Sequence, residues 1–176
     1  MVPAILILTF AWTLSSMASL LGAAEYVAGI VDSSAAGLQM FLPAIIFVVA
    51  GGLAFSTGTS WGTFGILIPI ITSVLATDST MLIMSISACL AGAVFGDHCS
   101  PISDTTIMAS SGAQCDHISH VSTQLPYALT VAAVSFVSYI IAGVVGSVWI
   151  SLPIAIVLMI GALFVIRSVS KKKQAS

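Results

Sequence analysis

One polar stretch interrupts the apolar sequence near the middle of the chain: GDHCSPISD, residues 96–104. Apolar residues 81–95 lead into it, and residues 105–113 can resume as a short helix after it. Pro101 has no backbone N–H and disfavours the helical conformation at Ser100. The sequence therefore predicts that a membrane helix is broken here, with irregular backbone between its two parts.

The same stretch contains two carboxylates, Asp97 and Asp104. An Asp at the centre of a membrane helix costs about 2.5–3.5 kcal/mol on insertion scales, so it needs a functional or structural reason. Either Asp104 or Ser103 could cap the helix that resumes. An alternative is that both carboxylates lie in a wet loop, where they cost little.

A second polar stretch, STGTSWGT at residues 56–63, divides another apolar region in the same way. Its arms, residues 41–55 and 64–76, contain 15 and 13 residues, fewer than the roughly 20 that cross a bilayer. We expect one helix broken in the middle or a re-entrant pair, because irregular backbone at membrane depth is tolerated inside protein or beside a watery cavity. The alternative is an aqueous loop between two short spans.

The composition identifies the class of protein. Of the 176 residues, 59% are apolar and 6% are charged, the formal net charge is −2, and the mean hydropathy is +1.17. These values exclude an ordinary soluble domain and a disordered chain. Four basic residues are too few for a nucleic-acid-binding protein, and long apolar runs without alternation argue against a β-barrel. An all-α polytopic membrane protein remains.

Three further apolar stretches are long enough to span alone: residues 3–24, 125–146 and 148–166. Polar connections are predicted at residues 25–40 and 114–124, and Gly146-Ser147 is the expected turn between the last two spans. The tail, residues 167–176, holds all four basic residues, which places the C-terminus in the cytoplasm. We therefore predict a single transmembrane domain, residues 1–176, with about five hydrophobic segments, two of them broken or re-entrant.

Side-chain oxygens are concentrated at the two breaks, and oxygen ligands suit Na⁺ or H⁺ rather than a soft metal. The candidate ion and substrate site contains Asp97, Asp104, Ser100, Ser103, Thr105, Thr106, Thr57, Thr59 and Ser60. No Lys or Arg lies nearby in the sequence to neutralise the carboxylates. Low dielectric favours the neutral form of a carboxylate, which either a proton or a sodium ion can provide. Alternating exposure of such a site would exchange H⁺ for Na⁺.

The histidines suggest further chemistry. His98 lies between the site residues and is a candidate for proton handling or pH sensing. His117 and His120 are expected in a solvated loop, and a zinc site there lacks a third strong ligand. An intramembrane hydrolase is disfavoured, because His98 and Ser100 are two residues apart and do not face each other on a helix.

Three stretches resemble the NhaC-type Na⁺/H⁺ antiporters. Residues 95–106 resemble the signature of that family, AFSTGTSWGT at 54–63 resembles its other polar break, and CDHISHVSTQLPY at 115–127 resembles the segment after the signature. Residues 11–28, which begin Ala11-Trp12, are also similar to the family. The likeness covers nearly the whole chain in order.

The resemblance implies Na⁺/H⁺ antiport across the bacterial cytoplasmic membrane by a multi-pass protein. It implies one repeat of an ion transporter built from two inverted halves, with the polar residues of both breaks as the ion site. The partners would be the lipid bilayer, Na⁺ and H⁺, and no cofactor is expected. Family members are considerably longer, so the chain is expected to correspond to the C-terminal half.

Several alternatives remain open at this stage. Some relatives of the family couple ions to organic acids, as in malate–lactate exchange, and amino-acid exchange is a related alternative. Transporter sites commonly form between two repeats. The chain could therefore act with an N-terminal half on a separate chain or as a homo-oligomer, or it could be an inactive fragment. A channel would show ion flux without coupling.

Overall fold

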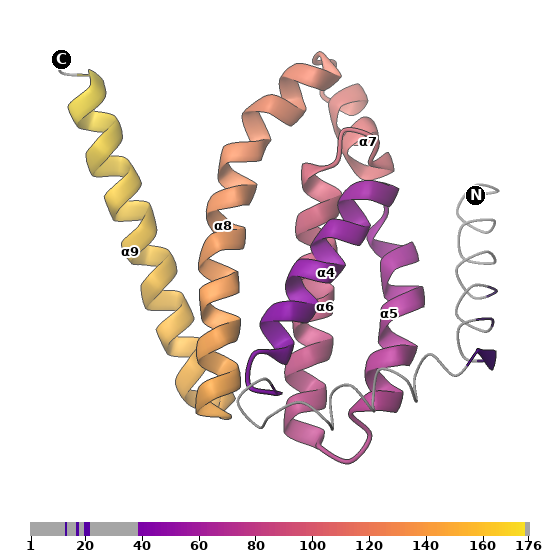
Figure 1. Ribbon diagram of the computed structural model, residues 1–176. Coiled ribbons are helices and arrows are strands. Elements are labelled where there is room, and N and C mark those ends of the chain that lie inside the picture. Colours follow the sequence, from indigo (N-terminus) through magenta and orange to yellow (C-terminus); the bar gives the residue numbers. More distant parts are fainter. Residues whose placement is uncertain (1–12, 14–16, 18–19, 22–38, 175–176) are drawn as a thin grey trace.

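The computed structural model describes residues 13, 17, 20–21 and 39–174 (Figure 1). The predicted first span, residues 3–24, and the polar connection 25–40 lie largely outside the described residues. All later segments of the prediction can be compared with the structure.

The described residues form six helices and no strand. The helices are α4 (Leu42–Thr57), α5 (Ser60–Val74), α6 (Ser79–Cys99), α7 (Asp104–Gly112), α8 (His117–Val145) and α9 (Val148–Gln174). By length and composition, α6, α8 and residues 148–168 of α9 can each cross a membrane. The prediction of an all-α polytopic membrane protein is confirmed.

The first polar break is a tight turn between two short helices. α4 ends because Gly58 adopts the left-handed conformation, with φ 67°. Thr59 then caps α5 by accepting a hydrogen bond from the backbone N–H of Gly62 at 3.4 Å. The chain turns back here, so that α5 runs opposite to α4 (Figure 1). Each helix is roughly 22–24 Å long, shorter than the core of a bilayer.

This break is shorter than the sequence suggested. Residues 56–63 were all expected outside a helix, but Ser56 and Thr57 belong to α4. Their hydroxyls donate hydrogen bonds to the carbonyl of Leu53 at 2.9 and 2.8 Å, an arrangement that helices accommodate. Polar hydroxyl side chains therefore do not end the helix, and the left-handed glycine does.

The second break is also shorter, because α6 continues through residues 96–99. α6 ends only at Ser100, whose extended conformation (φ −77°, ψ 126°) is the one that the following Pro101 favours. Ser103 caps α7 by accepting a hydrogen bond from the Thr106 N–H at 3.3 Å. The sequence offered Ser103 and Asp104 as candidate caps, and the structure selects Ser103. Asp97 therefore lies in the last turn of a membrane-length helix, and the breaks lie at helix ends.

The connection before α8 differs from the prediction as well. Residues 114–124 were expected to be non-helical, but the helix begins directly after Asp116, whose carboxylate accepts a hydrogen bond from the Ser119 N–H at 2.8 Å. At the other end, α8 stops at Gly146, which adopts φ 65°. The predicted turn at Gly146-Ser147 is confirmed.

Glycines bring the backbones of α4 and α6 into direct contact. A Cβ atom on Gly92 would collide with the carbonyl oxygen of Phe47, and one on Gly96 would collide with the carbonyl oxygen of Gly51. Both pairs advance by four residues in the same direction, so the two helices run parallel. Small residues at such positions let helices approach closely in a membrane.

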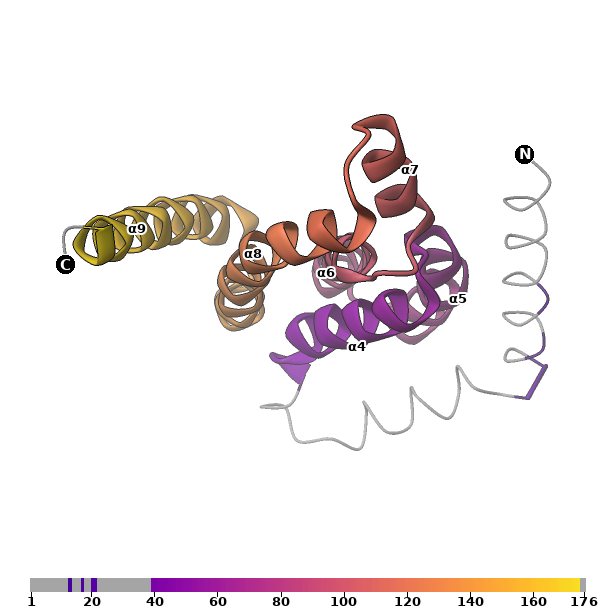
Figure 2. The ribbon, with the colours of Figure 1, turned by 90° about the horizontal axis from the view of Figure 1, so that it is seen from above.

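The helices are arranged around α6. Figure 2 shows α6 between α4, α5 and α8, with α9 on the outside, and α9 packs chiefly against α8. Small side chains fill the contact of α6 with α4 and α5; the fully buried ones are Ala50, Ala54, Cys89 and Ala93. Close backbone packing therefore brings α4 and α6 together at the centre of the bundle, and larger buried side chains such as Phe47 and Ile71 pack beside this contact.

The two breaks meet in space. A Cβ atom added to Gly58 would lie 2.7 Å from the carbonyl oxygen of Ile102, which belongs to the second break. The C-terminal ends of α4 and α6 and the beginnings of α5 and α7 therefore gather at one end of the bundle (Figure 1). The polar residues of both breaks are brought to the same place.

We expect Gly92→Ala to destabilise the protein, because the added Cβ atom must push α4 away from α6. The expected loss is about 1–3 kcal/mol, the usual cost of overpacking. Gly52→Ala on α4 is the matched control, since nothing lies within 4 Å of its Cβ position. Thermal unfolding of the purified proteins in detergent, followed by circular dichroism, measures both. Equal stability of the two variants would contradict the close backbone contact.

A second pair of glycine variants tests the contact between the breaks. Gly58→Ala and Gly146→Ala both place alanine in the left-handed region, at φ 67° and 65°, which costs about 1–2 kcal/mol. Only Gly58 has a neighbour, so Gly58→Ala should lose a further ~1 kcal/mol or more in the same unfolding experiment. Similar losses in both variants would show that Ile102 does not pack against this turn.

Candidate functional site

The carboxylate of Asp97 lies where the two breaks meet. Asp97 is 3% exposed. Its Oδ2 atom accepts hydrogen bonds from the hydroxyls of Ser60 at 3.2 Å and Thr105 at 3.4 Å. Ser60 begins α5 and Thr105 lies in the first turn of α7, so the carboxylate joins three helices. The Thr105 hydroxyl is also 2.8 Å from that of Ser103, which extends the hydroxyl cluster.

The other carboxylate oxygen of Asp97, Oδ1, is buried and has no hydrogen-bond partner among the described residues. An ionised carboxylate that is buried without full compensation costs several kcal/mol. All four basic residues of the chain lie within 167–173, in the last part of α9 and far along the sequence from this site. The local structure thus supplies hydroxyl groups to Asp97 but no compensating positive charge.

The oxygen atoms around Asp97 favour one class of ligand. They are carboxylate and hydroxyl oxygens, which are ligands for a hard cation such as Na⁺, and the carboxylate can alternatively hold a proton. Within the described part of the chain, no three His, Cys, Asp or Glu side chains come together as ligands for a metal ion. The arrangement is therefore suited to binding H⁺ or a single hard cation.

Three more of the predicted site residues are buried around Asp97. Ser100 and Ser103 are fully buried, and Thr106 is 3% exposed. The Ser100 hydroxyl accepts a hydrogen bond from the Ile102 N–H at 3.4 Å, and Ser103 caps α7 as described above. These hydroxyls thus shape the backbone of the second break.

The remaining predicted residues lie further from the carboxylate or at the surface. Thr57 is exposed and bonded to its own helix, while Thr59 is partly buried and caps α5. Asp104 is exposed, and its Oδ1 atom accepts a hydrogen bond from the neighbouring Thr105 N–H at 2.7 Å. The structure therefore buries Asp97 and exposes Asp104, although the sequence predicts the same role for both.

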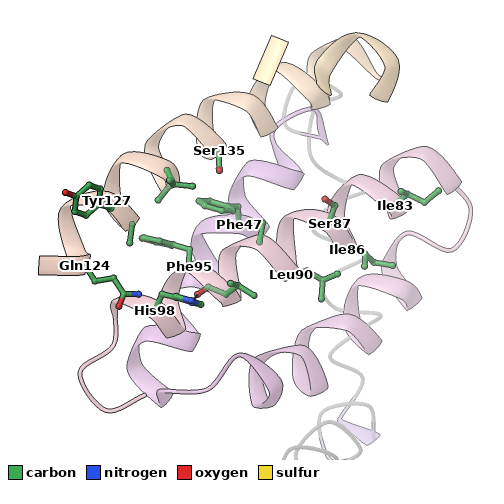
Figure 3. A pocket seen from close by; sticks show the side chains of 15 residues that line it. Phe47, Ile83, Ile86, Ser87, Leu90, Phe95, His98, Gln124, Tyr127 and Ser135 are labelled. Carbon is green, nitrogen blue, oxygen red and sulfur yellow. Dashed lines mark hydrogen bonds between the residues drawn. The ribbon is translucent and has the colours of Figure 1, made fainter. Parts of the chain in front are cut away.

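His98 follows Asp97 in the sequence but faces another part of the molecule. It is exposed, and its ring Nδ1 is 2.8 Å from the carbonyl oxygen of Val94 in the preceding turn. Its side chain lines a largely apolar pocket of about 900 Å³ between α6 and α8, where Figure 3 shows it beside Gln124. The structure gives His98 no hydrogen bond to the Asp97 cluster.

The structure places two further residues, Thr63 and His117, close to the two breaks, and the sequence does not predict either of them as a site residue. Thr63 is 1% exposed and donates a hydrogen bond to the Thr59 carbonyl at 3.0 Å; the spacing of four within the first break was the available signal. His117 was expected in a solvated loop, but its Nε2 lies 2.7 Å from the Pro101 carbonyl oxygen. Because that contact spans 16 residues, no local pattern could reveal it.

Several known proteins are similar in sequence to this chain over most of its length. An uncharacterized protein of Haemophilus influenzae is 50% identical over 141 residues, which are 80% of this chain and 27% of that protein. The malate-2H(+)/Na(+)-lactate antiporter of Bacillus subtilis is 30% identical over 111 residues, 61% of this chain and 24% of its own. An uncharacterized Na(+)/H(+) antiporter of Haemophilus influenzae is 34% identical over 111 residues, with the same shares of both chains.

The chain thus spans about a quarter of the length of the curated relatives it matches. No solved structure matches it. The helices that are long and apolar enough to cross a membrane support a multi-pass membrane protein. The sequence pattern of the Na⁺/H⁺ antiporter family matches residues 1–144, and the chain belongs to that family.

Proposed function

We propose that this chain supplies the ion site of a secondary antiporter that exchanges Na⁺ for H⁺. One observation carries this proposal: Asp97 is buried at the meeting point of the two breaks, and its Oδ1 atom has no partner among the described residues. A proton or a sodium ion can each neutralise this carboxylate, and the binding of one excludes the other. Competition for one site is the basis of exchange.

The surroundings of Asp97 favour a small hard cation as the competitor of the proton. The hydroxyls of Ser60 and Thr105 can turn their lone pairs to a cation, because a hydroxyl both donates and accepts. The C-terminal ends of α4 and α6 also lie here, and the negative ends of their helix dipoles favour cations, while the positive N-terminal ends of α5 and α7 offset part of this field. Broken helices of transporters use freed backbone carbonyls in the same way.

In this proposal Asp97 carries the exchange and Asp104 has a lesser role. An exposed carboxylate such as Asp104 is stabilised by water in its charged form, so it gains little from binding Na⁺. Of the two predicted acidic residues, Asp97 is therefore the primary ion-binding group in this proposal. Asp104 can still attract cations toward the site by its charge.

The second candidate function is ion-coupled exchange of organic acids, favoured by the similarity to the malate–lactate antiporter. An organic anion needs a positive anchor, and the chain carries its four basic residues only at 167–173. The N-terminal ends of α5 and α7, which lie beside Asp97, could provide this anchor through their helix dipoles. An anchor could also belong to a partner half of the transporter.

The orientation and partners follow from the same proposal. The basic segment 167–173 would lie in the cytoplasm of a bacterium, at the end of the bundle where the two breaks also lie (Figure 1). The ion site would then lie at the cytoplasmic end of the bundle. An N-terminal half, on the same or a separate chain, or a second copy would complete the pathway to the other side.

We expect Asp97→Asn to abolish Na⁺-driven proton movement, since asparagine cannot bind a proton or neutralise a cation. Asp104→Asn is the matched control, and it should keep at least about half of the rate because its carboxylate is exposed. The measurement uses everted vesicles from an antiporter-deficient host and a fluorescent reporter of the pH gradient. The chain is tested alone and beside the N-terminal half of a related antiporter.

The outcomes separate the candidate functions. Loss of exchange in Asp97→Asn, with exchange retained in Asp104→Asn, supports the proposal. Full activity of Asp97→Asn would contradict it, and a greater loss with Asp104→Asn would transfer the ion site to the surface. Proton movement that requires malate or lactate in addition to Na⁺ would favour the organic-acid function.

A further inference from the structure

His117 joins three separate parts of the structure. It is the first residue of α8. Its Nε2 atom lies 2.7 Å from the carbonyl oxygen of Pro101 in the second break, and its Nδ1 atom lies 3.1 Å from the hydroxyl of Ser110 in α7. One imidazole ring therefore links α8, the break and α7.

These two contacts lie on either side of the residues that reach Asp97. Ser103 and Thr105 follow Pro101 and precede Ser110 in the chain, and Thr105 donates a hydrogen bond to the Asp97 carboxylate. The segment between the two contacts, residues 102–109, contains the short break and only part of the nine-residue helix α7. Fixing both ends of so short a segment also fixes the position of its hydroxyls over the carboxylate.

The linkage can exist in both charge states of the imidazole. A carbonyl oxygen can only accept, so Nε2 donates to Pro101. In the neutral ring, Nδ1 accepts the hydroxyl proton of Ser110. In the charged ring, Nδ1 donates to Ser110, whose own proton then goes to the Ile107 carbonyl oxygen at 3.0 Å. His117 is thus suited to a constant mechanical role rather than to pH sensing.

We propose that His117 is a positioning residue for the ion site: it holds the second break and α7 in place so that Thr105 and Ser103 stay next to Asp97. This inference rests on the proposed function of Asp97. His117 does not touch the ion itself and acts through Pro101 and Ser110. It also connects the site to α8, so that a movement of α8 would displace the hydroxyls from the carboxylate.

The test measures Na⁺ binding by this chain in lipid nanodiscs with radioactive Na⁺, which does not depend on a complete transport cycle. His117→Ala is expected to raise the Na⁺ concentration for half-saturation by about 10-fold or more, the usual effect of losing a group that orients a ligand. The number of binding sites should stay the same. His117→Gln, which can donate and accept in a similar way, should recover most of the affinity.

A matched control and a second readout complete the design. His120→Ala removes the same side chain one turn along α8, where the ring makes no hydrogen bond among the described residues, and should leave Na⁺ binding unchanged. Maleimide labelling of Cys99, which is 5% exposed at the end of α6, reports on the break. In a Cys115→Ser background, His117→Ala should speed this labelling measurably, together with the loss of Na⁺ affinity.

Each outcome has one meaning. Na⁺ binding that depends on Asp97 but is unchanged in His117→Ala would overturn the positioning role and leave the proposed function intact. Faster labelling of Cys99 without a change in Na⁺ affinity would overturn it too, because His117 would then be merely structural. Na⁺ binding that is absent, or unaffected by Asp97→Asn, would instead overturn the proposed function. Weaker binding in His117→Ala, restored in His117→Gln, is the result we expect.

Discussion

The direct backbone contact between α4 and α6 determines where the polar groups of this protein lie. Gly92 and Gly96 carry no side chain, so α4 approaches until the carbonyls of Phe47 and Gly51 touch α6. The two helices run parallel and end at the same level, which brings the turn after α4 against the break after α6. Asp97 directly follows Gly96 and is buried, and its carboxylate accepts hydrogen bonds from Ser60 of α5 and Thr105 of α7. The position of the proposed ion site thus depends on helix packing as well as on the residues that line it.

The fold class and the existence of both breaks could be predicted from the sequence, because they depend on local properties. Apolar length identifies spans, and Pro101 excludes a helical conformation at Ser100. The polar residues predict longer breaks than the structure has, because a polar side chain by itself does not interrupt a helix. Asp97 shows the error: a carboxylate in the last turn of a helix does not interrupt it, since only the backbone groups form the helical hydrogen bonds.

The composition of the site was partly predictable, and its geometry was not. Hydroxyl-rich breaks indicated an oxygen-lined site, and Ser60 and Thr105 do bond to Asp97. The contact between Ser60 and Asp97 spans 37 residues, so it depends on the packing of whole helices. The histidines show the same limit. His98 is adjacent to Asp97 in the sequence and faces a different pocket, whereas His117, which is far along the chain, holds the break.

Asp97 and Asp104 illustrate why burial matters for exchange. A carboxylate in water is already stabilised in its charged form. Neutralising it therefore releases little free energy, and such a carboxylate binds a cation weakly. A buried carboxylate with an unpartnered oxygen is costly until a cation or a proton arrives, and the relief of that cost becomes binding energy. Because one carboxylate can be neutralised by only one of them at a time, the same burial makes the two ions compete. The burial of Asp97 therefore underlies both the affinity of the proposed site and the coupling between its ions.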